Sequence, residues 1–217
     1  MKIAIIGAGR MGAALGRCWS AAGHNIIFSY SRSPARLSAL ADQVGAQAAT
    51  PAQAAALAEV VLLAVHWSQL EDALTQAGDL TGKTLISCCV PLDPEDEYLL
   101  LGGQDSGIEF LARCLPATRI AGAFTTCPSE VIPEVFSCRH SLKPAAQMLY
   151  YCDHESLKPL VAGLIDDIGF EPVFIGGLAN GRFVEPFAMV TAALAYGQPG
   201  GAELIYRFDR LGKATKD

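Results

Sequence analysis

The first 41 residues contain no aspartate or glutamate, and the first acidic residue of the chain is Asp42. These 41 residues carry a formal charge of +5, which leaves −11 for residues 42–217 because the whole chain is −6. Their basic residues are Lys2, Arg10, Arg17, Arg32 and Arg36. A basic start on an acidic protein predicts a local anion site, whereas the negative total argues against nucleic acid as a partner.

Other absences exclude further classes of protein. No apolar run approaches the ~20 residues that cross a bilayer, and the chain opens directly with a core strand. We therefore expect no membrane span, no signal peptide and a cytoplasmic location. The seven cysteines are odd in number and form no CxxC pair, so a disulfide framework or a zinc site is unlikely to be the role of these residues. We expect most of them, including Cys127, to be buried packing residues.

The opening stretch has the pattern of a dinucleotide-binding unit, with a strand at 2–6, a glycine-rich turn and a helix. Gly7 lets the chain turn tightly, Gly9 lets a pyrophosphate approach the backbone, and Gly12 lets the helix pack closely on the sheet. The helix N-terminus offers unpaired N–H groups and partial positive charge to phosphates. The residues predicted to bind the cofactor here are Gly7, Ala8, Gly9, Arg10, Met11 and Gly12.

The second strand, predicted at 25–29, indicates which dinucleotide binds. NAD-binding proteins carry an acid about 20 residues after the glycines, where it holds the ribose 2′-hydroxyl. This chain has none there, and Ser31, Arg32, Ser33 and Arg36 offer hydroxyls and guanidinium groups instead. Such groups suit the 2′-phosphate of NADP(H), although Arg36 also fits a solvated helix face. We predict NADP(H) as the cofactor.

The remaining pattern predicts an α/β fold, a doubly wound, mostly parallel Rossmann sheet with a small C-terminal helical appendage. We assign residues 1–175 to the NADP-binding domain and 176–217 to the appendage, with acceptor-site and homodimer contacts. The appendage is predicted to be helix-rich over 176–197 and is basic at 213–217. Residues 93–107 are predicted to form a loop that either covers the site or is a surface excursion. Further strands are predicted at 59–65, 83–90, 119–124, 146–152 and 171–175, and helices at 35–44, 51–57, 68–77, 106–115 and 155–168.

Open parallel sheets bind ligands beyond the carboxyl ends of their strands. Val65, His66, Val90 and Ala123 lie at such ends in the predicted sheet, and we expect them to line the cofactor path. Hydride transfer is mainly positioning and needs no dedicated nucleophile or metal, in keeping with a sequence that shows no triad, metal-ligand or paired-carboxylate pattern. If a proton is needed, the weak candidates are His66, Thr125 and Thr126, with a packing role as the alternative for His66.

The ordered set of motifs resembles a family of short NADP-binding oxidoreductases, typified by NADPH:coenzyme F420 oxidoreductase and also found as a domain in STEAP metalloreductases. The resemblance implies hydride exchange between NADPH and a flavin-like ring. The chain has Thr125 where those enzymes have His, and His66 where they have Pro, so its second-ring pocket is expected to differ. The motifs are 7–12, 31–33, 65–67, 123–128, 180–185 and 201–204.

The small-molecule hydride acceptor stays open at this point: a flavin or deazaflavin, a quinone, a metal complex or another small molecule. A pyrroline-carboxylate-reductase-like or hydroxyacid dehydrogenase would share the N-terminal half, but it needs a longer helical C-terminal domain. A non-catalytic NADPH-binding sensor, or a subunit whose acceptor site forms with another protein, remains the alternative function.

Overall fold

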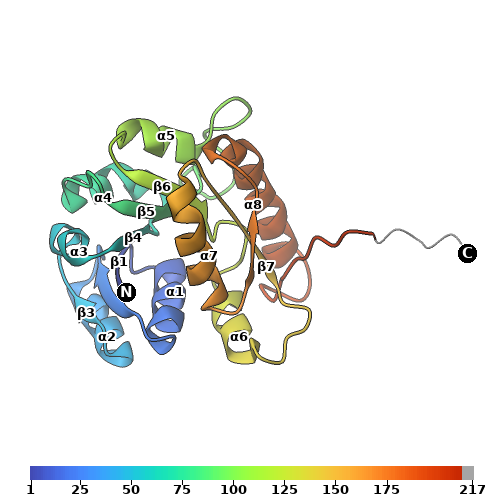
Figure 1. Cartoon of the computed structure of the whole chain (residues 1–217), viewed down its shortest axis with the longest axis horizontal. Coiled ribbons are helices and arrows are strands. Elements are labelled where there is room, and N and C mark those ends of the chain that lie inside the picture. The colour runs from blue at the N-terminus through green and yellow to red at the C-terminus, as the bar shows by residue number, and fades with distance from the viewer. Residues whose placement is uncertain (212–217) are drawn as a thin grey trace, which may run out of the picture.

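The computed structural model describes residues 1–211, so the predicted basic end at 213–217 lies outside the described residues. The strands form one sheet in the order β3-β2-β1-β4-β5-β6-β7-β8 (Figure 1). They are β1 (Lys2–Ile6), β2 (Asn25–Ser29), β3 (Gln47–Ala48), β4 (Val60–Leu63), β5 (Thr84–Ser87), β6 (Arg119–Ala123), β7 (Gln147–Cys152) and β8 (Glu171–Phe174). Every pair is parallel except β6 and β7, which are antiparallel.

The strand order confirms the predicted doubly wound, mostly parallel sheet. The chain runs outward from β1 to β2 and β3, then returns to place β4 on the other side of β1. The direction of winding therefore reverses between β1 and β4. In open α/β sheets this reversal leaves a crevice at the carboxyl ends of the strands, which is where ligands bind.

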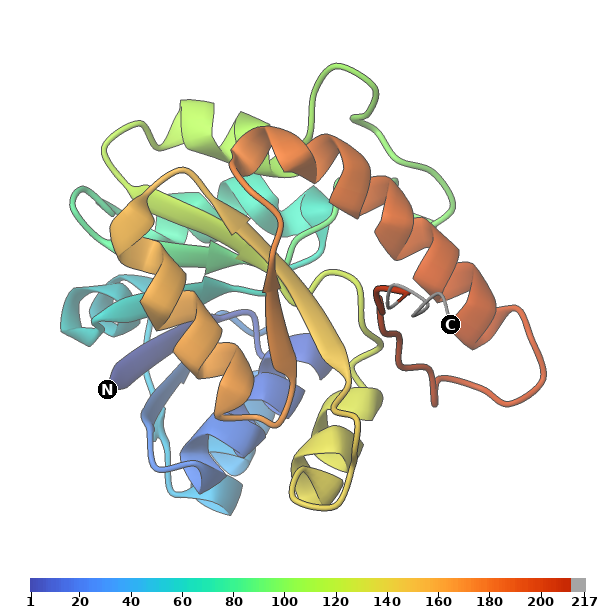
Figure 2. The ribbon, with the colours of Figure 1, turned by 45° about the vertical axis from the view of Figure 1, so that its right-hand side comes forward.

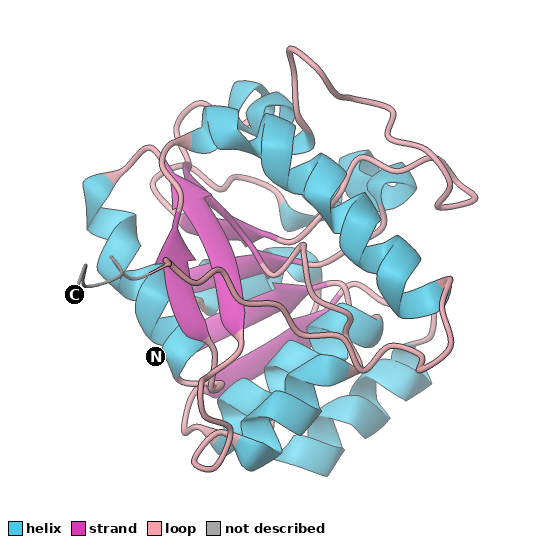
Figure 3. Ribbon diagram, turned by 90° about the vertical axis from the view of Figure 1, so that its right-hand side faces the viewer, coloured by secondary structure: helices cyan, strands magenta, loops and turns pink. Residues whose placement is uncertain are grey.

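Two layers of helices enclose the sheet, as the views in Figures 2 and 3 show. One layer packs α1, α2, α6 and α7 on the face that carries Ile3 and Ile5, and the other packs α3, α4, α5 and α8 on the face of Ala4 and Ile6. The helices are α1 (Arg10–Ala21), α2 (Pro34–Val44), α3 (Pro51–Leu57), α4 (Leu70–Ala77), α5 (Gly107–Cys114), α6 (Val131–Cys138), α7 (Lys158–Asp166) and α8 (Gly181–Tyr196).

The central strands are buried on both faces, which explains their unbroken apolar sequences. All residues of β4 are buried, as are all residues of β1 after Lys2. Close packing of α1 on this sheet depends on a small residue, because a side chain at Gly16 would overlap the ring of Phe28. The short helix α3 begins with a cap in which Thr50 accepts a hydrogen bond from Gln53 N and Pro51 occupies the first position.

The structure differs from the sequence prediction in a few elements. Helix α6 was not predicted, because Pro133 interrupts its pattern; this proline lies in the first turn, where its missing N–H has no intrahelical partner to lose. The helix predicted at 155–168 begins as a 3-10 turn over Glu155–Leu157 and becomes α-helical at Lys158. The strand predicted at 83–90 is shorter, since β5 ends at Ser87.

The part of the chain after β8 contains the 3-10 turn Leu178–Asn180 and then α8, in agreement with the helix predicted over 176–197. Helix α8 contacts α5 along one side of the molecule, and the chain then turns back toward the sheet (Figure 2). None of the helices within residues 1–211 combines the length and the apolar character needed to cross a bilayer.

Candidate functional site

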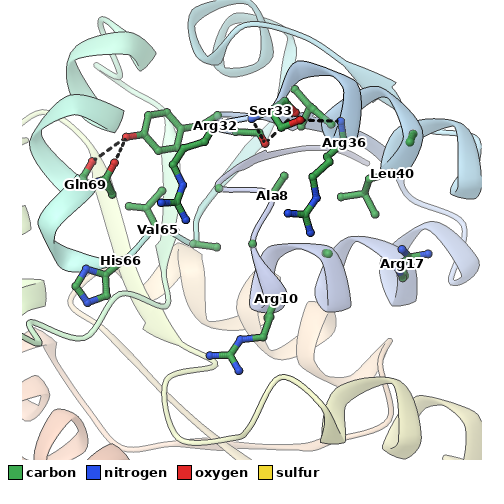
Figure 4. A pocket seen from close by; sticks show the side chains of 18 of the residues that line it. Ala8, Arg10, Arg17, Arg32, Ser33, Arg36, Leu40, Val65, His66 and Gln69 are labelled. Atoms are coloured by element: carbon green, nitrogen blue, oxygen red, sulfur yellow. Dashed lines mark hydrogen bonds between the residues drawn. The ribbon is translucent and has the colours of Figure 1, made fainter. Parts of the chain in front are cut away.

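A cavity of about 970 Å³ opens at the carboxyl ends of β1, β2 and β4, at the crevice described above (Figure 4). Three segments form most of its wall: the glycine turn and start of α1, the segment 30–37 that follows β2, and residues 64–69 after β4. We call it the first cavity. All three segments belong to the unit that the sequence predicted to bind a dinucleotide.

The glycines of the turn have different surroundings. Gly7 has a φ of +113°, and a side chain there would overlap Ala64 O. A Cβ on Gly12 would overlap Gly7 O, so this buried residue sets the approach of α1 to the turn. Gly9, by contrast, borders the first cavity with nothing within 4 Å of the position where a Cβ would lie. The open space beside Gly9, at the start of α1, fits a group that approaches the backbone, such as a pyrophosphate.

Four arginines, Arg10, Arg17, Arg32 and Arg36, line the first cavity, and no carboxylate is among the lining residues in the described chain. Arg32 and Arg36 extend into the same space (Figure 4), and neither takes part in an ion pair within residues 1–211. Nη1 of Arg10 lies 3.7 Å from Oε1 of Glu130, and Arg17 donates a hydrogen bond to Gln43 Oε1 at 2.7 Å. The cavity thus attracts a ligand with several negative charges.

The serines after β2 also shape the backbone of this site. Ser33 is the N-cap of α2, where its hydroxyl accepts a hydrogen bond from Arg36 N at 3.3 Å. Ser31 Oγ accepts from Ser33 N at 3.2 Å, which holds the turn between β2 and α2. The three residues Ser31, Arg32 and Ser33 therefore lie together on the cavity wall with Arg36 one helical turn away.

Tyr30 and Gln69 form a part of the first cavity that the sequence did not predict. Tyr30 has a φ of +57°, uncommon for a residue with a side chain, and its hydroxyl donates to Asp72 Oδ2 at 2.7 Å. Burial, followed by this bond to Asp72, raises the pKa of Tyr30 to about 12, so the phenol stays neutral. The only sequence signal was its position directly after β2.

A second cavity of about 360 Å³ adjoins the first. Five residues line both cavities, so the two spaces meet at their common wall: Gly9, Arg10, Ala64, Val65 and His66. The rest of the second wall comes from Met11, from Cys88 after β5, from the 124–129 turn after β6, and from one side of α8. Residues on α8 that face it are Ala188, Thr191, Ala192 and Tyr196.

Three of the predicted site residues line neither cavity. Val90 and Ala123 line neither cavity; Cys88 and Phe124 take those places, because β5 ends at Ser87 and the chain turns at Phe124, whose φ is +65°. Thr126 is 1% exposed and its hydroxyl lies 2.6 Å from that of Tyr206, so it faces away from the cavities. Its neighbour Thr125 does line the second cavity, and its buried Oγ1 has no hydrogen-bond partner among residues 1–211.

His66 lies at the junction, and both of its ring nitrogens have partners. Nδ1 is 2.7 Å from Ser68 Oγ and accepts from Ser68 N at 3.2 Å, while Nε2 is 3.0 Å from Asp96 Oδ1. Asp96 comes from the 93–107 loop, and Pro94 of the same loop lines the first cavity. This arrangement ties the loop to the site and gives His66 an anchoring role.

Two cysteines, Cys88 and Cys127, line the second cavity. Burial raises the pKa of Cys127 to about 12 and that of Cys88 well above its usual range, so the thiolates are absent at neutral pH. All seven cysteines are free. No group of three or more metal-ligating side chains occurs within residues 1–211.

The motif at 180–185 positions α8 as a wall of the second cavity. Arg182 forms a bidentate ion pair with Glu109 of α5, in which Nε donates to Oε2 at 2.8 Å and Nη2 donates to Oε1 at 2.6 Å. Glu185 is 1% exposed and accepts hydrogen bonds from Gly107 N and Ile108 N at the start of α5. Both contacts fix α8 against α5 and leave its small residues facing the cavity.

Comparison with known proteins agrees with this geometry. Residues 2–91 match the family model of NADP oxidoreductases that are coenzyme F420-dependent. The F420-dependent NADP reductase of Methanothermobacter thermautotrophicus is 30% identical over 208 residues, which cover 85% of this chain and 85% of that protein. The chain belongs to this family. It is therefore an NADP-dependent oxidoreductase.

Two further relatives define how far the likeness extends. Rat metalloreductase STEAP3 is 25% identical over 185 residues, and this oxidoreductase chain spans only 36% of the length of that protein. A crystal structure of an F420-dependent NADP-reductase from Arthrobacter sp. FB24 superposes with a TM-score of 0.85 at 24% identity, over 97% of this chain and 100% of that one. The likeness to the Arthrobacter structure establishes the fold.

Proposed function

We propose that this oxidoreductase transfers a hydride between NADPH in the first cavity and a flavin-like or deazaflavin acceptor in the second. The observation that carries the proposal is the shared wall, where Gly9, Arg10, Ala64, Val65 and His66 line both spaces. Two redox rings must come within contact distance for a direct transfer. Two adjoining cavities, the first lined by four arginines and the second by a mixture of apolar and polar side chains, supply the two places such a reaction needs.

The chain's own residues fit NADP(H) at both phosphate positions. The open backbone at Gly9 and the N–H groups at the start of α1 would bind the pyrophosphate. Ser31, Arg32 and Ser33, with Arg36, would bind the 2′-phosphate through charge-assisted hydrogen bonds. When bound, the nicotinamide supplies the hydride. The residues at the shared wall would orient its reactive end and exclude water.

The second cavity suits a ring that is mainly apolar and has polar edges. Its wall includes Phe124, Pro128 and Ala192, together with Thr125, whose buried Oγ1 has no hydrogen-bond partner within residues 1–211. A buried hydroxyl without a partner is costly, which favours a ligand atom that completes it. Since His66 is held by Ser68 and Asp96, Thr125 is the better placed of the predicted candidates to contact the acceptor.

Steady-state oxidation of NADPH, followed at 340 nm with riboflavin, FMN, FAD, coenzyme F420 and menadione, tests the proposal. We expect turnover with at least one flavin or deazaflavin. Binding of NADPH without turnover on any of these acceptors would contradict it and favour the sensor alternative.

A variant that fills the second cavity sharpens this test. Ala192→Phe places a large ring in a space of about 360 Å³ while leaving the first cavity intact, since Ala192 lines only the second. We expect loss of turnover with the dissociation constant of NADPH unchanged, as measured by calorimetry. If Ala192→Phe instead weakened NADPH binding as strongly as it lowered turnover, the second cavity would be part of the nucleotide site.

We also propose that the C-terminal part of the chain, 176–217, provides the contacts of a homodimer as well as the wall of the acceptor site. The outer side of α8 carries Phe183, Val190 and Leu194, which are 71%, 52% and 51% exposed. Their spacing of seven and four residues places them on one stripe of the helix. A second copy that packs its own α8 there would bury this apolar stripe.

A further inference from the structure

The segment after α8 returns to the sheet and lies beside β7 at the place where β6 has ended (Figures 2 and 3). Strand β6 pairs with β7 only through Tyr150, Tyr151 and Cys152, because it stops at Ala123. The first half of β7 is therefore free on that side, and the returning segment occupies it. Tyr206 O accepts a hydrogen bond from Gln147 N at 3.2 Å, and Gln147 Oε1 accepts one from Phe208 N at 2.6 Å.

Tyr206 connects this segment with the turn after β6. Its phenol oxygen lies 2.6 Å from Thr126 Oγ1 and accepts a hydrogen bond from Leu149 N at 3.2 Å. The ring packs edge-on against Phe187 of α8, with centroids 5.5 Å apart. One hydroxyl thus joins β7 and the 124–129 turn, while its ring contacts α8.

The turn that Tyr206 holds is a wall of the second cavity. Thr125 and Cys127, on either side of Thr126, both line that cavity. The turn also contains Phe124 in a left-handed conformation, which persists only where surrounding contacts impose it. Neighbouring Arg207 keeps the returning segment in place by donating to Ala145 O at 2.6 Å and to Glu171 at 3.2 Å.

We propose that Tyr206 is a positioning residue of the acceptor site, which holds the 124–129 turn so that Thr125 faces the acceptor. The inference rests on the proposed role of the second cavity. Tyr206 itself lines neither cavity, so its effect is indirect. The nucleotide site, formed by the opposite side of the shared wall, is expected to be independent of it.

The substitution Tyr206→Phe tests this, because it removes the hydroxyl and keeps the ring that packs on Phe187. The matched control is Tyr150→Phe, which removes a β7 phenol that makes no side-chain hydrogen bond within residues 1–211. With riboflavin as the probe acceptor, we expect Tyr206→Phe to raise the KM for riboflavin about fivefold, the effect of roughly one net hydrogen bond. The KM for NADPH stays within about twofold of wild type, and Tyr150→Phe changes neither. A change shared equally by both KM values, or no change in either, would overturn the assignment.

Hydrogen exchange of the amides in 124–130 gives a second readout that needs no turnover. Faster exchange there in Tyr206→Phe, with unchanged exchange in β1 and α1, supports the inference. Unchanged exchange at 124–130 overturns it, whatever the kinetics show. If the wild-type protein oxidises NADPH with no flavin or deazaflavin, that failure counts against the proposed acceptor, while the exchange result still decides the role of Tyr206.

Discussion

Replacing Arg32 by alanine tests the choice of NADP over NAD directly. Arg32 extends into the first cavity beside Ser31 and Ser33 and forms no ion pair within residues 1–211. A charge-assisted hydrogen bond contributes about 1.5–3 kcal/mol. Arg32 is exposed, so solvent screening favours the lower figure of ~1.5 kcal/mol, about a tenfold change in the dissociation constant.

The comparison between nucleotides isolates the 2′-phosphate. NADPH and NADH share the pyrophosphate, so any general loss of positive potential in the cavity weakens both. We expect Arg32→Ala to raise the Kd of NADPH about tenfold and that of NADH by less than about twofold, measured by calorimetry. Arg17→Ala is the matched control, because Arg17 lines the same cavity but donates to Gln43. It should affect the two nucleotides alike.

Ionic strength provides a further constraint. The Debye length falls from about 10 Å at 0.1 M salt to about 3 Å at 1 M, so the loss caused by Arg32→Ala should shrink at high salt if the contact is a solvent-exposed charge pair. Equal losses of NADPH and NADH affinity at low salt would refute the reasoning. So would a preference of the wild-type protein for NADH.

Substitutions at four other positions, one of them with a matched control, probe the remaining arguments. Gly9→Ala should weaken NADPH binding and leave the melting temperature nearly unchanged, because the added methyl enters open space, whereas Gly12→Ala should lower the melting temperature since it overlaps Gly7 O. Burial raises the pKa of Glu185 from 4.5 to about 7, so the folded state retains a proton that the unfolded state releases; the stability from this difference is present below pH 4.5 and is lost as pH rises toward 7. Calorimetry should therefore show that the difference in melting temperature between wild type and Glu185→Gln decreases as the pH rises from 4.5 to 7. A difference that does not depend on pH would contradict the assigned pKa. Leu194→Glu should convert a dimer to a monomer in light scattering, while Leu57→Glu, at a leucine exposed to a similar 53%, should not.

The first cavity, where we propose that the nucleotide binds, was predictable because its determinants are local. The glycine turn, the short strand before it and the basic segment 31–36 lie within one βαβ unit, and their spacing alone places them around one crevice. The continuous apolar sequence of β4 predicted burial on both faces, and the alternation of strands and helices predicted a doubly wound, mostly parallel sheet.

The second cavity, the proposed acceptor site, was less predictable because it is assembled from distant segments. Cys88, the 124–129 turn and α8 meet only after the antiparallel return of β7 brings the C-terminal part of the chain over the sheet. Small residues such as Ala188 and Ala192 recur at helical spacing, but that pattern equally describes ordinary helix packing. The true ends of β5 and β6 decided whether Val90 and Ala123 or their neighbours line the cavity, and strand ends are the least certain feature of a sequence pattern.

Backbone conformation points to the same two cavities independently of any sequence motif. Three residues other than glycine have positive φ values within residues 1–211: Tyr30, Asp96 and Phe124. Tyr30 lines the first cavity, Phe124 lines the second, and Asp96 bonds His66 at the junction between them. Left-handed conformations cost free energy for residues with a side chain, and proteins retain them mainly where function imposes them. Two of these residues lie on the cavity walls and the third contacts a residue of the shared wall, which is a reason, separate from the family relationship, to regard both spaces as parts of one site.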